Sequence, residues 1–368
     1  MESNRTVLVT GGSGFIGSHL VCSLVLKHTD WRIINLDTLD YCCSRRSLQA
    51  VEDRSNYSLI RGDICNPQLV NHIFNTENID VVFHLAAKTH VESSFESPSC
   101  FHRVNVEGTQ VLLSAACQAP HTLHRFIYIS TDEVYGAGPG QGLDETSPLR
   151  PNNPYAATKA AAETHVLSYW DTHRVHTHTL LQLQFPVIIT RSNNVYGPRQ
   201  YTEKVIPRFL SLLRNNRKCT IQGTLPKSRH FLFVADAVDA LLLLLEKGIV
   251  GEVYNVGTSF EIPITHLARE LIKTVKNVPD SQVKDWLEFV PDRPVLELRY
   301  PITCDKLKQL GWREKVTWTE GIRHTVKWYQ DNPDFWWNTE EDQRPITEEF
   351  QHVMDTSGLC SSTDRIQT

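Results

Sequence analysis

The stretch VLVTGGSGFIGSHL, residues 7–20, decides the fold of this chain. It starts as a short apolar strand, passes through Gly11, Gly14 and Gly17, and ends in a helical pattern. Glycine tolerates positive φ and lets the backbone approach a pyrophosphate closely, and the start of the next helix offers free N–H groups. The stretch therefore predicts the dinucleotide-binding turn of a Rossmann-type fold.

Short apolar runs alternate with helical patterns from residue 5 to residue 191. The predicted strands are 5–10, 31–37, 57–63, 80–86, 125–130 and 185–191, and the predicted helices begin near Phe15, Pro67, Pro98 and Tyr155. Strands that alternate with helices indicate βαβ units. We therefore predict an α/β fold with a doubly wound parallel sheet covered on both faces.

The pattern loosens after residue 192, where Pro, Gly and basic residues separate shorter elements. We predict an NAD-binding Rossmann domain over 1–192 and a smaller mixed α/β substrate-binding lobe over 193–345, with some exchange of chain between the two. Residues 346–368 are polar and without periodicity, which predicts a disordered tail.

Composition excludes several classes of function. The net charge is −5 and no run is dense in Lys or Arg, which argues against binding nucleic acid or an anionic membrane. The longest leucine run, 241–245, is far shorter than the about 20 apolar residues of a membrane span. The residues before the first strand lack a basic region followed by a long apolar stretch, so we expect no signal peptide, and the nine cysteines show neither CxxC nor zinc spacing. We therefore expect a cytoplasmic protein with reduced cysteines and no metal site.

Acidic residues end the second and third predicted strands. Asp37 lies twenty residues after Gly17, where a carboxylate accepts a hydrogen bond from a ribose 2′-OH and repels a 2′-phosphate. The position favours NAD over NADP. Asp63 and Ile64 end the third strand and could flank the adenine, although a strand-end Asp is more often simply solvated.

Two further stretches carry acid–base chemistry. YAATK places Tyr155 and Lys159 one turn apart on the same face of a helix. There the ammonium would lower the pKa of the phenol and could hold the nicotinamide ribose, so that Tyr155 could take a proton from a substrate hydroxyl. STDEVYG, residues 130–136, leaves the fifth strand through the adjacent carboxylates of Asp132 and Glu133.

Together these motifs resemble a known family. TGGSGFIGSH, NLDTLDY, HLAAKTHVESS, STDEVYG, NPYAATKAAAE and RSNNVYGP occur in the order found in the extended short-chain dehydrogenase/reductases that act on nucleotide sugars. Within that group the chain is most similar to the dTDP-glucose 4,6-dehydratases, in particular the animal members. The resemblance covers about residues 5–330.

The resemblance implies a three-step reaction and a use for both carboxylates. Tyr155, with Thr131 beside it, would remove the proton of the sugar C4 hydroxyl while hydride passes to NAD. Glu133 would then remove the acidified C5 proton as a protonated Asp132 donates a proton to the departing C6 hydroxyl. Hydride would return to C6 and regenerate the cofactor. A homodimer built on helices 98–119 and 155–172 is also implied.

The resemblance further assigns binding residues. Those implied for the cofactor are Gly11, Gly14, Phe15, Ile16, Gly17, Asp37, Asp63, Ile64, Leu85, Ala86, Ala87, Tyr155, Lys159 and Asn194. Those implied for the nucleotide sugar are Thr89, Thr131, Asn193, Lys204, Val205, Arg229 and Arg293. Two arginines suit a clamp on a diphosphate.

Three alternatives remain open. A UDP-glucuronate decarboxylase of the same superfamily would have Ser in place of Asp132, and an epimerase would lack both acids. A cofactor-binding protein without catalysis would explain Lys88, which stands where bacterial relatives usually have Glu. The nucleotide is also open between dTDP and UDP, since the stretch DRPVLELRY, residues 292–300, has Leu296 where the family's usual DRPGHD has its His.

Residues 171–187 form a longer join between helix and strand than relatives have. The segment contains His173, His176 and His178, but their spacing without a nearby Cys is poor for zinc. We interpret it as a surface loop. Because the preceding helix carries Tyr155 and Lys159, strain at its end would lower activity.

Overall fold

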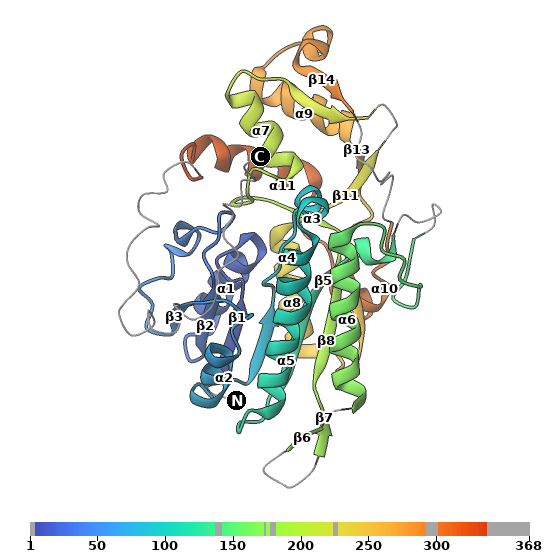
Figure 1. Ribbon diagram of the computed structural model, residues 1–368. Coiled ribbons are helices and arrows are strands. Elements are labelled where there is room, and N and C mark those ends of the chain that lie inside the picture. Colours follow the sequence, from blue (N-terminus) through green and yellow to red (C-terminus); the bar gives the residue numbers. More distant parts are fainter. Residues whose placement is uncertain are drawn as a thin grey trace, which may run out of the picture.

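The computed structural model describes residues 4–136, 142–172, 174–176, 182–223, 227–291 and 301–336. Figure 1 shows a larger lobe built on one twisted sheet and a smaller lobe beyond one end of that sheet. The predicted α/β class with a Rossmann-type parallel sheet is confirmed.

The main sheet has seven parallel strands within the described residues. Their order across the sheet is β12-β8-β5-β4-β1-β2-β3. The strands are β1 (Thr6–Thr10), β2 (Arg32–Asp37), β3 (Tyr57–Arg61), β4 (Val81–His84), β5 (Arg125–Thr131), β8 (Val187–Ser192) and β12 (Val253–Val256). Six of them correspond to the predicted strands. The order in which successive strands are added reverses at β1, and such folds bind ligands beyond the strand ends at this point.

Helices cover both faces because successive apolar side chains of each strand point to opposite faces. Val7 and Ile33 pack in one core with the helices of the first face, and Leu8 and Ile34 pack in another with those of the second. The first face carries α1 (Phe15–Lys27) and α8 (Val234–Lys247). The second carries α2 (Pro67–Thr76), α5 (Gly108–Gln118) and α6 (Pro154–Thr172).

The predicted helix over 98–119 is divided in the structure. After α3 (Val91–Glu96), the chain forms α4 (Pro98–His102), a π-helical turn (Arg103–Glu107) and then α5. The turn carries Asn105, whose amide bonds the backbone N–H and C=O of Lys88 at 2.8 and 3.0 Å and donates to Thr158 at 2.9 Å. The interruption therefore ties the segment after β4 to α6.

The smaller lobe has its own core. A sheet of β9 (Asn194–Tyr196), β11 (Ser228–Phe233) and β13 (Glu261–Pro263) and a parallel pair, β10 (Cys219–Gln222) and β14 (Leu287–Val290), form its strands. Its helices are α7 (Val205–Arg214), α9 (Ile264–Lys276) and α11 (Trp318–Asp331). The chain returns to the larger lobe through α8, β12 and α10 (Asp305–Gln309), so the division at residue 192 stays a prediction.

The long join after α6 contains two short strands. β6 (Arg174–His176) and β7 (Gln182–Gln184) pair antiparallel, where a loop was expected. In Figure 1 they lie at the bottom, at the end of α6 farthest from Tyr155. Of the three histidines, His173 and His178 lie outside the described residues. As for membranes, no helix in the described ranges combines the length and apolar character needed to cross one.

A buried ion pair joins α6 to β8. Both guanidinium nitrogens Nε and Nη2 of Arg191 donate to the carboxylate of Glu163, at 2.7–3.1 Å, and the two side chains are 5% and 1% exposed. Arg191 also donates to the hydroxyl of Tyr135 at 2.9 Å. Such a pair adds little over apolar packing, but losing one partner leaves a buried charge uncompensated.

We therefore predict that Glu163→Gln lowers the free energy of unfolding by about 3–5 kcal/mol. Glu77→Gln is the matched control because it breaks the solvent-exposed Arg32–Glu77 pair, and it should cost less than about 1 kcal/mol. Chemical denaturation of both variants measures the difference. Equal losses would contradict the assignment of Glu163 to a buried pair.

Candidate active site

The glycine turn brings β1, α1 and the end of β4 into close contact. Gly11 has φ +72°, and a Cβ there would lie 2.7 Å from the backbone N of Ala86. A Cβ on Gly17 would fall on the carbonyl oxygen of Gly11. Only glycine fits at both positions, so the turn packs tightly between β1, the end of β4 and the start of α1, as a dinucleotide-binding turn requires.

The other predicted cofactor residues surround this turn. Gly14 is the N-cap of α1, and Phe15 and Ile16 form its half-buried first turn. The backbone N–H groups of Leu85 and Ala86 donate to Thr10, to its carbonyl oxygen and its hydroxyl respectively. Ala87 follows them, half-buried.

The predicted ribose carboxylate, Asp37, is buried at the end of β2. Its two oxygens accept from the backbone N–H groups of Ser13 and Leu39, at 2.9 and 2.8 Å. Burial raises its pKa, while these hydrogen bonds oppose the shift. The bonds fix the carboxylate beside the glycine turn.

Asp63 and Ile64 follow β3, and their side chains lie in different surroundings. The carboxylate of Asp63 accepts from the backbone N–H of Cys65 at 2.9 Å and pairs with Arg103. The side chain of Ile64 is buried in the core against Gly108. Contact with an adenine would therefore fall to the backbone of Ile64 rather than its side chain.

The two adjacent carboxylates lie in a tight 3-10 turn (η3, Asp132–Tyr135) directly after β5. Asp132 is 3% exposed, and its Oδ2 accepts a hydrogen bond from Nδ2 of Asn193 at 2.7 Å. Burial raises the pKa of Asp132 to about 7, and the nearby Glu133 adds to the shift. A group with this pKa is part protonated at neutral pH and can act as an acid.

Tyr155 lies at the start of α6 and faces this turn. The side chain of Thr131 lies close to the hydroxyl of Tyr155, and Glu133 and Asp132 are close enough to act on that hydroxyl electrostatically. The pKa of Tyr155 is raised, first by burial and then by the charge of Glu133. The phenol, the hydroxyl and both carboxylates therefore converge at the end of β5.

The prediction that Lys159 lowers the pKa of Tyr155 is wrong for this structure. Nζ of Lys159 donates to the carbonyl oxygen of Ile129 at 2.7 Å and lies 4.2 Å from the ring centre of Tyr128. Burial lowers the pKa of Lys159 to about 7, partly offset by Glu163. Spacing along the helix placed Lys159 on the correct face but did not predict these competing partners.

Asn153 holds Glu133 in place, and no motif in the sequence predicted this role. Its Nδ2 donates to Oε2 of Glu133 at 2.9 Å, and its Oδ1 caps α6 by accepting from the backbone N–H of Ala156 at 2.8 Å. Asn followed by Pro154 immediately before a helix is a recognisable start signal, so this cap could have been found. Its bond to a carboxylate twenty residues away could not.

The predicted substrate residues lie where the two lobes meet. Lys204 precedes α7 and donates to the carbonyl oxygen of Thr89 at 2.8 Å, so the backbone of Thr89 rather than its hydroxyl is engaged. Val205 begins α7, and Asn194 begins β9. Arg229, on β11, lies near enough to Asp132 to lower its pKa. Arg293 lies outside the described residues.

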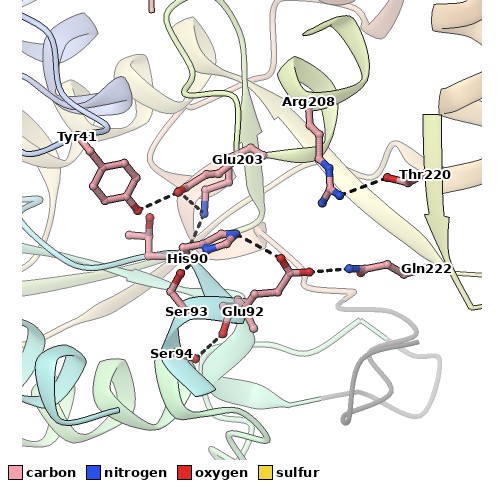
Figure 2. A network of polar contacts seen from close by, with 12 residues as sticks. Tyr41, His90, Glu92, Ser93, Ser94, Glu203, Arg208, Thr220 and Gln222 are labelled. Carbon is pink, nitrogen blue, oxygen red and sulfur yellow. Dashed lines mark hydrogen bonds and ion pairs between the residues drawn. The ribbon is translucent and has the colours of Figure 1, made fainter. Parts of the chain in front are cut away.

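Figure 2 shows the polar network around this junction. The hydroxyl of Tyr41 donates to Glu203 at 2.9 Å, and Nε2 of Gln222 donates to Glu92 at 2.5 Å. Together these two bonds connect the larger lobe to the smaller one. As for metals, no group of three or more His, Cys, Asp or Glu side chains in the described part of the chain is placed to hold an ion.

Comparison with known proteins shows the family to which the chain belongs. A family model described as GDP-mannose 4,6 dehydratase matches residues 8–325. The chain belongs to this family. The dTDP-D-glucose 4,6-dehydratase of Bos taurus is 50% identical over 343 residues, 93% of this chain and 93% of the bovine protein. The Homo sapiens protein of the same name is 49% identical over 93% of this chain and 95% of its own length.

Solved structures of family relatives match as well. A dTDP-glucose 4,6-dehydratase of Streptomyces venezuelae, crystallised with NAD, has a TM-score of 0.82 and 34% identity, covering 91% of this chain and 99% of that one. A UDP-glucose 4-epimerase of Thermotoga maritima has a TM-score of 0.78 and 28% identity, covering 89% and 100%. Relatives that catalyse different reactions thus share this fold. The reaction of a member must therefore be inferred from the residues of its site.

The raised pKa of Asp132 predicts a pH-dependent stability. The pKa of Asp132 is about 7 in the folded protein and 3.8 in the unfolded chain. As the pH rises from 3.8 to 7, the unfolded chain ionises at this residue and the folded protein does not, so the free energy of unfolding falls. Asp132→Asn removes that cost. The variant should exceed the wild type in unfolding free energy by about 2–4 kcal/mol at pH 8.

Urea denaturation of both proteins from pH 4 to pH 8 measures this difference. It should grow with pH up to about 7 and then level off. A difference that stays constant over the range would show that Asp132 does not carry a raised pKa.

Proposed function

We propose that the chain catalyses the NAD-dependent dehydration of a nucleotide-diphosphate glucose, dTDP-glucose in the first instance, to the 4-keto-6-deoxy sugar and water. The observation that carries this proposal is the convergence of Tyr155, Thr131, Asp132 and Glu133 at the end of β5. Relatives about half identical in sequence are named for this reaction.

NAD fits the residues around the glycine turn. The tight turn through Gly11 and Gly17 places the N-terminus of α1 directly after β1, where its N–H groups could bind a pyrophosphate, and the buried Asp37 is fixed where a ribose hydroxyl could donate to it. When bound, NAD would supply the acceptor and donor of hydride. We propose that Lys159, one turn along α6 from Tyr155, contributes to holding the nicotinamide ribose.

Tyr155 and Thr131 would act in the oxidation at C4. Tyr155 would accept the proton of the C4 hydroxyl as the phenolate, and the nearby side chain of Thr131 would orient that hydroxyl. Because burial raises the pKa of Tyr155, the phenol stays protonated until a cationic group or a bound substrate favours its ionisation. Tyr155 is therefore a base only in the assembled complex.

The two carboxylates would divide the elimination between them. Asp132, whose pKa is about 7, holds a proton that it can donate to the departing C6 hydroxyl. Glu133, held by Asn153, takes the C5 proton. An acid and a base on adjacent residues can serve neighbouring carbons of one sugar because their environments differ.

The nucleotide would lie between the lobes. Lys204, Val205 and Arg229 border this junction, and we propose that they bind the nucleotide diphosphate together with Asn193, Thr89 and Arg293. We further propose a homodimer that pairs the α5 and α6 faces of two subunits, and a cytoplasmic location. The choice between dTDP and UDP falls to the same region.

The alternatives from the same superfamily differ at Asp132. A decarboxylation needs no acid for a leaving hydroxyl, and an epimerisation needs neither carboxylate. Asp132 favours dehydration over these alternatives. Its burial makes ionisation unfavourable in the folded protein, and a costly group of this kind beside the phenol of Tyr155 is typical of a catalytic acid.

We predict that the purified protein converts dTDP-glucose to a product lighter by one water, observed by mass spectrometry. UDP-glucose in a parallel incubation tests the nucleotide. Asp132→Asn should still oxidise C4, seen as reduced nicotinamide, and should lose product formation about a hundredfold or more, within the range of general acid catalysis.

Unchanged mass for both substrates with the wild type would refute the dehydration. Product formation by Asp132→Asn at the wild-type rate would refute the acid role of Asp132 alone.

A further inference from the structure

The side chain of Asn153 forms hydrogen bonds both at the start of α6 and to the turn after β5. The side chain is 4% exposed. Its oxygen accepts from Ala156 N–H and caps the helix that carries Tyr155, and its amide nitrogen donates to Glu133 Oε2 at 2.9 Å. One planar amide therefore fixes the helix bearing the phenol relative to the carboxylate of Glu133.

Few side chains could make both bonds. Ser and Asp are good N-caps, but a serine hydroxyl is too short to reach the carboxylate with a donor, and an aspartate would place a second negative charge against Glu133. A neutral amide caps with its oxygen and donates with its nitrogen. A donated N–H to a carboxylate is a strong, charge-assisted hydrogen bond that favours the ionised form.

We propose that Asn153 is a positioning residue that holds the carboxylate of Glu133 in place and aimed at C5 of the sugar. The inference rests on the proposed dehydration and adds a determinant of its elimination step. Asn153 acts through Glu133 and does not itself contact the reacting atoms. Its loss should slow the removal of the C5 proton and leave oxidation at C4 intact.

The chain contains a matched control for the capping role. Asn66 caps α2 in the same way, since its side chain accepts from Leu69 N–H at 3.1 Å and Pro67 follows it in the first turn. Asn66→Ser and Asn153→Ser therefore make the same exchange at two helix starts. Only the second removes a donor from a carboxylate in the candidate site.

The experiment compares Asn153→Ser, Asn153→Asp and Asn66→Ser with the wild type for dTDP-glucose turnover, substrate KM, reduced-nicotinamide absorbance and thermal unfolding. We expect Asn153→Ser to lower kcat about tenfold with little change in KM, the size expected of one hydrogen bond to a charged group. Asn153→Asp should lower kcat further. In both, reduced nicotinamide should accumulate during turnover because elimination lags behind oxidation. Asn66→Ser should keep the wild-type kcat.

Wild-type kcat in both Asn153 variants would overturn the inference, as would a kcat loss without accumulation of reduced nicotinamide. An equal kcat loss in Asn66→Ser would overturn it too, because general destabilisation would then explain the effect. A wild type that forms no dehydrated product would instead refute the proposed function, and with it the elimination step on which Asn153 is proposed to act.

Discussion

The candidate site depends on the parallel pairing of β5 with β8. In this register Thr131 lies opposite Ser192, so the residues that follow each strand, Asp132 and Asn193, leave the sheet side by side. Their 2.7 Å hydrogen bond buries a carboxyl group at the carboxyl edge of the sheet. Asn193 in turn accepts from the backbone N–H of Thr258, just after β12. Three adjacent strands thus fix the position of one acid.

Burial of Asp132 lowers the stability of the folded protein but gives the site a carboxyl group that can act as an acid. A carboxyl with a pKa near 7 is costly to ionise in the folded protein, but it can give up a proton at neutral pH. Glu133, one residue later, is less buried and receives the amide of Asn153. The same turn therefore presents two carboxyl groups in different environments, and Tyr155 faces both. Elimination across two neighbouring carbons requires this pairing of unlike groups.

Local sequence patterns predicted much of this structure. The glycine turn, six of the seven strands of the main sheet and the segment that holds Asp132 and Glu133 follow from strand periodicity and from the conformational freedom of glycine. The remainder depends on contacts between distant residues. β12 joins the sheet from beyond the smaller lobe, Lys159 bonds Ile129 rather than acting on Tyr155, and Asn153 reaches Glu133 from the next helix. No pattern of spacing reports such partners, because each is set by how two elements pack.

The central claim is that one sugar is oxidised and dehydrated within a single site. The most direct test traces the hydrogen of C4 into the product. dTDP-glucose carrying deuterium at C4 is incubated with the wild-type protein, and the label is located in the product by NMR spectroscopy. Convergence of Tyr155, Asp132 and Glu133 on one bound sugar predicts deuterium at C6 of the product, transferred without exchange with solvent. Deuterium that stays at C4 or is lost to water would contradict it.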